Sequence, residues 1–228
     1  TSTDNGVIDS IIIRLFNLTN DQVNSSLNFS SQSGLLANFT GLSDGIYYIN
    51  STVNDTFGNS NSTSIRKITI DTTFPNVSST SITRAYNNGT NLFISPQKQE
   101  GLYDNVSIDL AYSEEVSASI YVVNSTGSTV RTLYSDSSVT NPQPKIWNGT
   151  DDSDSFVSDG KYTVNTTITD SANNTNITQV AIVYVDNTAP LFSSHSKSLV
   201  PNDIQDVQIN ATLTEATNVS NVILVVRT

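Results

Sequence analysis

The chain has 228 residues, no cysteine and a net charge of −11, with 10 Lys and Arg residues against 21 Asp and Glu. So few basic residues exclude nucleic acid as a partner and disfavour an anionic membrane surface, while the lack of cysteine excludes disulfides and thiolate chemistry. Charged residues make up only 14% of the chain, below the ~25% of an average soluble protein, so Ser, Thr and Asn must form the solvated faces. This composition is typical of an extracellular surface. No apolar run approaches the ~20 residues that span a bilayer, so we expect no membrane insertion of this segment.

The first predicted element is a strand at Val7 to Phe16, a run rich in β-branched residues. Residues 17–40 are rich in Asn and Ser, which is consistent with one or two short strands and loops. From Tyr47 to Val53 apolar and polar residues alternate, the period of a half-buried strand, and a second strand is expected at Ile65 to Ile70. Pro75 cannot continue a sheet ladder, so it marks the end of a unit. The chain starts without Met or a visible signal peptide, so we expect a processed protein or a segment of a longer one.

The stretch from Ser43 to Pro75 occurs a second time, from Ser158 to Pro190, without a gap. The differences 159 − 44 and 190 − 75 both give an offset of 115 residues. A period of this length corresponds to one small domain, so the sequence predicts a tandem repeat. Further strands of the middle unit are predicted at Val106 to Tyr112, Ala118 to Asn124 and Val130 to Tyr134. Together with the second copy of the repeat they give about seven strands, as a sandwich requires.

Each copy opens with Asp-Gly-x-Tyr, at Asp44 to Tyr47 and at Asp159 to Tyr162. A tight turn there delivers a Tyr to a strand, much as in the tyrosine corner of immunoglobulin-type sandwiches. The pattern resembles the Ig-like repeats of large bacterial and archaeal surface proteins of the S-layer and adhesin type. In the middle unit Trp147 to Asp152 precedes the motif, which is similar to the Ig-like domain of flagellar hook-capping proteins. The resemblance implies an all-β fold of tandem Ig-like β-sandwiches and leaves open whether the units are spacers, adhesins or polymer subunits.

The repeat divides the chain into three pieces. Residues 1–75 form an Ig-like domain that lacks its first strands, residues 76–190 form a complete one, and residues 191–228 hold the first strands of another. An incomplete unit exposes apolar side chains at ~1.5–3 kcal/mol for each large one, against a domain stability of ~5–15 kcal/mol. Either the chain belongs to a longer tandem array, or the third piece of one subunit completes the first piece of the next in a head-to-tail homopolymer. The two pieces together are about as long as one repeat. The predicted contact strands carry Val207, Ile209, Ala211 and Leu213 on the third piece and Ile11, Ile13 and Leu15 on the first.

Sequons of the type Asn-x-Ser/Thr are numerous, and some coincide in the two copies, such as Asn50 with Asn165 and Asn61 with Asn176. A chain this rich in Asn, Ser and Thr creates part of them by chance. Asn50, Asn165, Asn105 and Asn210 fall opposite the apolar positions of predicted strands, where a glycan must lie. N-linked glycans are therefore expected, and the candidates are Asn17, Asn24, Asn28, Asn38, Asn50, Asn54, Asn61, Asn76, Asn88, Asn105, Asn124, Asn148, Asn165, Asn173, Asn176, Asn210 and Asn218.

Acidic residues raise the question of calcium. Calcium binds oxygen ligands, and the acidic residues that could supply them are the hairpin residues Asp151, Asp152, Asp154 and Asp159 and the pairs Asp55/Asp71 and Asp170/Asp186 near the ends of the two units. Their spacing matches no EF-hand loop. Turn-forming aspartates that bond their own backbone produce the same pattern, so no cofactor is expected beyond this weak calcium candidate.

The sequence predicts no enzyme. His195 is the only histidine and falls in a Ser-rich linker with no nucleophile motif near it. Glu114 and Glu115 are typical of a solvated turn between strands rather than of a glycosidase pair. The single Trp, Trp147, is expected in the core of the sandwich.

We therefore expect a non-enzymatic cell-surface protein, the repeating subunit of an archaeal or bacterial filament, sheath or S-layer. The rival hypothesis is an adhesin or carbohydrate-binding protein that binds a partner with loops at one end of a sandwich. Such a module should gather aromatic side chains, and the candidates Tyr86, Phe93, Tyr103 and Trp147 are scattered in the sequence.

Overall fold

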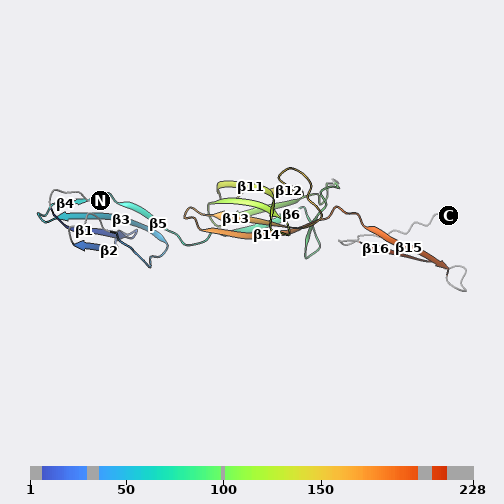
Figure 1. The fold of residues 1–228 in the computed structure, drawn as a ribbon, viewed down its shortest axis with the longest axis horizontal. Coiled ribbons are helices and arrows are strands. Elements are labelled where there is room, and N and C mark those ends of the chain that lie inside the picture. The colour runs from blue at the N-terminus through green and yellow to red at the C-terminus, as the bar shows by residue number, and fades with distance from the viewer. Residues whose placement is uncertain (1–6, 30–35, 99–100, 200–206, 215–228) are drawn as a thin grey trace. The chain divides into compact units, whose positions relative to one another are not determined.

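The computed structural model describes residues 7–29, 36–98, 101–199 and 207–214. This part of the chain consists of strands, turns and loops, and it contains no helix long and apolar enough to cross a membrane (Figure 1). The chain divides into two units, Thr1–Phe74 and Pro75–Thr228, one residue from the boundary that the sequence predicts. The strands are β1 Ile8–Phe16, β2 Gln22–Phe29, β3 Gly45–Asp55, β4 Ser60–Ser62, β5 Arg66–Ile70, β6 Val77–Thr83, β7 Tyr86–Asn87, β8 Leu92–Ile94, β9 Val106–Tyr112, β10 Val116–Val123, β11 Thr129–Val139, β12 Lys145–Trp147, β13 Gly160–Thr169, β14 Thr175–Val185, β15 Leu191–Leu199 and β16 Val207–Thr214.

Residues 75–190 build two sheets that enclose one core. A six-stranded sheet has the order β11-β10-β13-β14-β8-β7, and a three-stranded sheet has the order β12-β9-β6. Alternation produces this arrangement, because every second residue of β9, β10 and β13 is buried between the sheets. The first strands of the unit contribute to both sheets. Strand β6 pairs with β9 in the smaller sheet, and β8 then pairs in parallel with β14 in the larger one. The all-β sandwich predicted from the sequence is confirmed.

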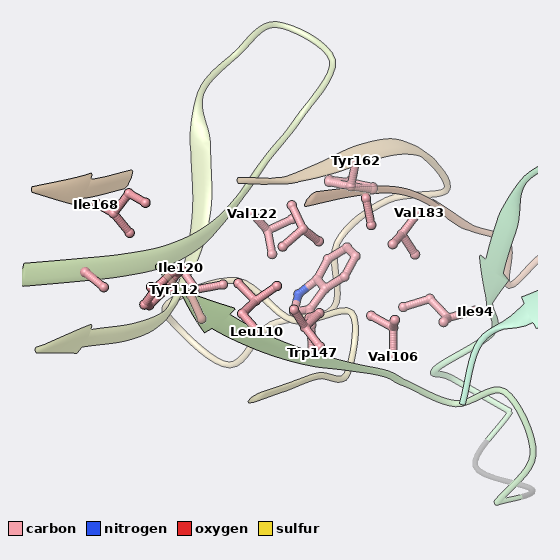
Figure 2. Packing of buried hydrophobic residues seen from close by; sticks show 14 of the residues in the cluster. Ile94, Val106, Leu110, Tyr112, Ile120, Val122, Trp147, Tyr162, Ile168 and Val183 are labelled. Atoms are coloured by element: carbon pink, nitrogen blue, oxygen red, sulfur yellow. The ribbon is translucent and has the colours of Figure 1, made fainter. Parts of the chain in front are cut away.

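The core of this sandwich is centred on Trp147, which is fully buried. Its indole lies between the sheets among Leu110, Val122 and Tyr162 (Figure 2), with the Tyr162 ring centroid 5.3 Å away. Burial of the indole N–H is compensated, since Nε1 donates to the Thr150 carbonyl oxygen at 2.9 Å. The expectation that Trp147 is a core residue is correct.

The first unit contains a single sheet in the described residues, ordered β2-β1-β3-β4 with β5 also paired to β3. Its pairing reproduces four strands of the larger sheet of the sandwich. Ile13 lies opposite Ser51 on β3, and Ile120 lies opposite Thr166 on β13, which is the repeat equivalent of Ser51. Strands β1 and β3 therefore correspond to β10 and β13, and β4 and β5 together correspond to β14.

Strands β15 and β16 form a two-stranded antiparallel sheet. The predicted strand around Val207 to Leu213 is thus present. The assignment of His195 to a linker is wrong, because His195 lies within β15 opposite Ala211; alternating polar residues such as Ser, His and Lys form a strand when a partner supplies the ladder. The apolar run Val219 to Val226 predicts a further strand, which lies outside the described residues.

Candidate functional site

The opening turn of each repeat has the same geometry in both units. The Tyr47 hydroxyl donates to the Ser43 carbonyl oxygen at 2.9 Å, and the Tyr162 hydroxyl donates to the Ser158 carbonyl oxygen at 2.8 Å. Each phenol bonds backbone four residues upstream, as a tyrosine corner does. The predicted corner is therefore present twice.

The residues that leave each unit are tied back to the same turn. Asp44 accepts hydrogen bonds from the hydroxyls of Thr72 and Thr73, both at 2.8 Å. The backbone N–H of Thr72, together with these two hydroxyls, holds the pKa of Asp44 below its ordinary value. Because Thr72 and Thr73 are separated from Pro75 only by Phe74, the carboxylate fixes the chain where it leaves the unit. We call this arrangement of an aspartate and the exit segment the exit clamp.

The second unit repeats the exit clamp with Asp159. This carboxylate accepts the backbone N–H of Asn187 at 2.9 Å and the hydroxyl of Thr188. Burial raises the pKa of Asp159, but the hydrogen bonds from Thr188 and Asn187 outweigh it, so the pKa lies below its ordinary value.

The turns that follow β3 and β13 are also equivalent. Asp55 accepts two backbone N–H groups of its own turn and the side-chain amide of Asn59. Asp170 does the same with Asn174 as the side-chain partner. Residues with positive φ complete both turns, Gly58 at 85° in one and Asn173 at 71° in the other.

The carboxylates of the remaining calcium candidates have partners within the protein. Asp151 accepts two backbone N–H groups of its own turn, Asp152 accepts the N–H of Thr132 at 2.9 Å, and Asp154 pairs with Arg131 at 2.8 Å. No three of the four predicted carboxylates of the acidic hairpin gather within 4.8 Å of one another. Each of Asp71 and Asp186 accepts the N–H two residues further on, as in an Asx turn.

Aromatic side chains that are scattered in the sequence do converge on the middle unit. The Tyr86 ring lies 6.4 Å from Phe93 and 5.4 Å from Tyr103, and Phe93 stacks on Tyr184 at 5.3 Å. Three of the four predicted candidates thus form a row with Tyr184, which the sequence analysis missed. Trp147 does not take part, because it is enclosed in the core.

A cleft of about 290 Å³ adjoins this aromatic row. It is lined by Arg84, Gly101, Leu102, Tyr103, Asp104 and Asn105, and we call it the β8–β9 cleft because most of the lining precedes β9. Arg84 and Tyr103 both have positive φ, 71° and 61°, which bulky residues rarely adopt. The Oδ1 atoms of Asp104 and Asn105 are buried without a hydrogen-bond partner. Strained backbone and unpaired acceptors at one place are typical of a ligand site.

The sequon asparagines fall into two groups among the residues whose side chains are described. The exposed ones are Asn24, Asn38, Asn61, Asn76, Asn88, Asn148 and Asn173, and the half-buried ones are Asn17, Asn50, Asn54, Asn105, Asn124, Asn165 and Asn176. In the second group the Nδ2 of Asn54 donates to Ser10 and that of Asn176 donates to the Pro75 carbonyl, both at 3.0 Å. Since Nδ2 is the atom that carries a glycan, the exposed group is better suited. Asn28, Asn210 and Asn218 lie outside the residues with described side chains.

The predicted contact residues of the first unit differ in exposure. Ile11 and Leu15 are already buried, at 9% and 2% exposure, whereas Ile13 is half-buried. Of the residues considered for catalysis, Glu115 accepts a hydrogen bond from the Ser138 hydroxyl, as a turn residue does.

No family model and no curated protein matches the chain. Among solved structures the chain is similar to dimeric latent PorU from Porphyromonas gingivalis, with 12% identity, a TM-score of 0.33 and coverage of 81% of this chain and 16% of that one. It is also similar to fibronectin(III)-like modules of CbhA from Clostridium thermocellum (10% identity, TM-score 0.38, 81% and 82% of the chains) and to an amphioxus IgVJ-C2 molecule (9% identity, TM-score 0.26, 79% and 92%).

The sheets and core of the middle unit define an Ig-like β-sandwich. This is a modular domain of the kind found in many extracellular proteins.

Proposed function

We propose that the chain is a structural part of the extracellular surface, the repeating subunit of a filament, sheath or S-layer of an archaeal or bacterial cell. The observation that carries the proposal is the repetition of the exit clamp. In both units an aspartate of the opening turn binds the residues that leave the unit, Thr72 and Thr73 in one and Asn187 and Thr188 in the other. A module that serves as a spacer needs a chain held at its exit, and both clamps hold it there.

The surface supports this role. Many exposed residues of both units are polar and uncharged, and several are sequon asparagines. Glycans at these asparagines would prevent non-specific pairing of open sheet edges with other chains. The carboxylates of the acidic hairpin have protein partners, and we propose that this hairpin functions without a metal.

Labelling of intact cells tests the proposal. Antibodies against the middle unit should bind intact cells that carry the native gene, and electron microscopy of isolated envelopes should place the label on an ordered surface structure. Glycopeptide mass spectrometry should find glycans at exposed sites such as Asn61 and Asn148 before half-buried ones such as Asn54. Label that appears only after permeabilisation would contradict the proposal.

The β8–β9 cleft favours a second candidate function, carbohydrate binding. Tyr86 and Tyr103 are 40% and 39% exposed, so their rings could stack on the apolar face of a sugar. Sugar hydroxyls are donors, and they would satisfy the unpaired Oδ1 atoms of Asp104 and Asn105. A few fixed polar groups beside an apolar wall are typical of small-ligand sites.

Titration with neutral oligosaccharides, monitored by NMR, tests this second function. Mannotriose or cellotriose should shift the resonances of Tyr103 and Asn105 in the native chain, and Tyr103→Ala should weaken binding by about tenfold or more, the loss of one stacking contact. Phe156→Ala is the matched control, because Phe156 is also exposed, at 44%, but does not line the cleft. Equal binding by the two variants would count against the cleft.

A further inference from the structure

The sheet of the first unit has an apolar face that the described part of the chain leaves partly open. Ile49 and Val53 of β3 are half-buried, although their repeat equivalents Val164 and Ile168 are fully buried. On β5 the contrast is larger, since Ile68 is 38% exposed and its equivalent Val183 is completely enclosed. Because Ile11 and Leu15 are already buried, the open area lies over Ile13 and strands β3 and β5.

In the sandwich this same face is covered by the sheet of β6, β9 and β12. The hairpin β15–β16 reproduces the pairing register of the first two of these strands. Ile82 pairs with Ile108 in β6–β9, and Lys197 pairs with Ile209 in β15–β16, at the equivalent positions. The match includes a β-bulge, which falls between Val77 and Ser79 in one hairpin and between Phe192 and Ser194 in the other. A shared bulge fixes both register and twist, so β15–β16 has the backbone of a covering sheet.

Residue sizes also match across the two open parts. Relative to β9, strand β16 has smaller residues at two positions, Ala211 for Leu110 and Leu213 for Tyr112. Relative to β10, strand β1 has larger residues at two positions, Ile11 for Ala118 and Leu15 for Val122. Cores tolerate such exchanges when the total volume is kept. The smaller residues of the hairpin and the larger residues of the first sheet are therefore changes in opposite directions, as complementary packing requires.

The linkers disfavour closure within one copy. The chain enters the sandwich beside the start of β14, where Asn176 donates to the Pro75 carbonyl, and leaves at its other end, after Val185. The 11 residues of β14 span roughly 35 Å. The five residues 186–190 between β14 and β15 reach at most about 18 Å, so the hairpin cannot readily return along the strand to the entry side.

We infer that β15–β16 of one copy of the chain covers the open face of the β2-β1-β3-β5 sheet in a second copy. In this arrangement β15 and β16 stand where β6 and β9 stand in the sandwich. The register positions of Val106, Ile108, Leu110 and Tyr112 are then taken by Val207, Ile209, Ala211 and Leu213. Because the donating and accepting surfaces differ, the association is head-to-tail and builds open chains. The inference rests on the proposed structural function and names its partner as a second copy.

Two variants of the 228-residue chain, each defective in one surface, test the inference. Ile209→Asp disables the hairpin and leaves the face intact, whereas Ile68→Asp disables the face and leaves the hairpin intact. Their matched controls are Thr212→Asp and Thr69→Asp, at exposed neighbouring positions. Hydrogen exchange of the β1 and β3 amides verifies that each variant is folded. We expect Ile68→Asp to fold, because the Ile68 side chain is partly exposed in the native chain.

Sedimentation velocity or mass photometry then gives the readout. The native chain and both controls should form a concentration-dependent series of oligomers, and each Asp variant alone should be monomeric, with self-association weakened at least about 100-fold by a buried, unpaired carboxylate. An equimolar mixture of the two Asp variants should stop at a 1:1 dimer, since only one functional hairpin and one functional face remain. A monomeric native chain, a mixture of folded variants that stays monomeric, or an Ile209→Asp variant that still forms the series would overturn the inference. Surface labelling of cells is independent of this result. A chain that is monomeric in solution, with label still on an ordered surface structure, would overturn the inference and leave the proposed function standing.

Discussion

Residues 43–75 and residues 158–190 share their turns, their tyrosine corner and their exit clamp, yet one copy lies in an open sheet and the other in a closed sandwich. The Tyr47 and Tyr162 hydroxyls donate to equivalent carbonyl oxygens at almost the same distance, 2.9 and 2.8 Å. Burial is where they differ. Along β13 alternate residues are fully buried, whereas every residue of β3 is half-buried.

The difference separates what a segment determines by itself from what its neighbours determine. Turn residues with positive φ and aspartates that bond nearby N–H groups act within a few residues. Burial instead requires a second sheet about 10 Å away, supplied by other parts of the chain. The same local sequence can therefore be a complete core strand in one unit and a docking surface in another.

The largest expected effect comes from removing the centre of the closed core. Trp147→Ala should destabilise the middle unit by about 3–5 kcal/mol, since it deletes a fully buried indole. The variant weakens the contact between the two sheets of the sandwich, a contact for which the described residues of the first unit show no counterpart. Urea denaturation followed by circular dichroism measures the loss, and a change below about 1 kcal/mol would mean that the facing sheet is not what distinguishes the units.

The equivalent isoleucines Ile120 and Ile13 compare the two cores at one position. Ile120 is 1% exposed and Ile13 is half-buried. Ile120→Ala should cost about 2–5 kcal/mol, and Ile13→Ala about 1–2 kcal/mol. Fluorescence of Trp147, the only tryptophan, reports unfolding of the middle unit, and hydrogen exchange of β1 reports the first. Equal costs in the monomeric chain would show that the first sheet is already covered.

The sequence predicts most of the local structure. Asp-Gly-x-Tyr gives the corner, Asp55 and Asp170 give the turns, and alternation in residues 106–112 gives a strand with one buried face. It could not place Tyr86, Tyr103 and Tyr184 together, because β7, β8 and β14 become neighbours only through a parallel pairing between strands about 90 residues apart. His195 was misplaced for a related reason: a Ser-rich stretch becomes a strand only when a partner such as β16 supplies the ladder. The unpaired oxygens of Asp104 and Asn105 have no sequence signal at all.

A smaller effect is expected from the tyrosine corners. Tyr162→Phe should cost about 1 kcal/mol, because it removes one hydrogen bond from a buried side chain, and Tyr47→Phe about half of that, because water reaches the half-buried ring. Thermal unfolding of each variant against the native chain measures both. If Tyr47→Phe destabilises the chain more than Tyr162→Phe does, burial in the closed sandwich does not determine the cost of losing this hydrogen bond.

The smallest expected difference between the units is their response to acid, because the exit clamps are the feature they share most closely. Hydrogen bonds lower the pKa of Asp44 and Asp159 below the ordinary value of 3.8. A carboxyl group whose pKa is lower in the folded state stabilises that state above its unfolded pKa, and this stabilisation disappears as the pH falls through the folded value. Both units should therefore keep their stability down to about pH 4 and lose part of it below that, to similar extents. Asp159→Asn removes the titrating group from one clamp, so the acid dependence of the middle unit should become shallower while that of the first unit stays the same. If the two units respond in parallel, the clamp acts as a local device that needs no closed core. A steeper acid response of the middle unit would instead show that closure strengthens the clamp, because a larger loss of stability in acid means a lower folded pKa.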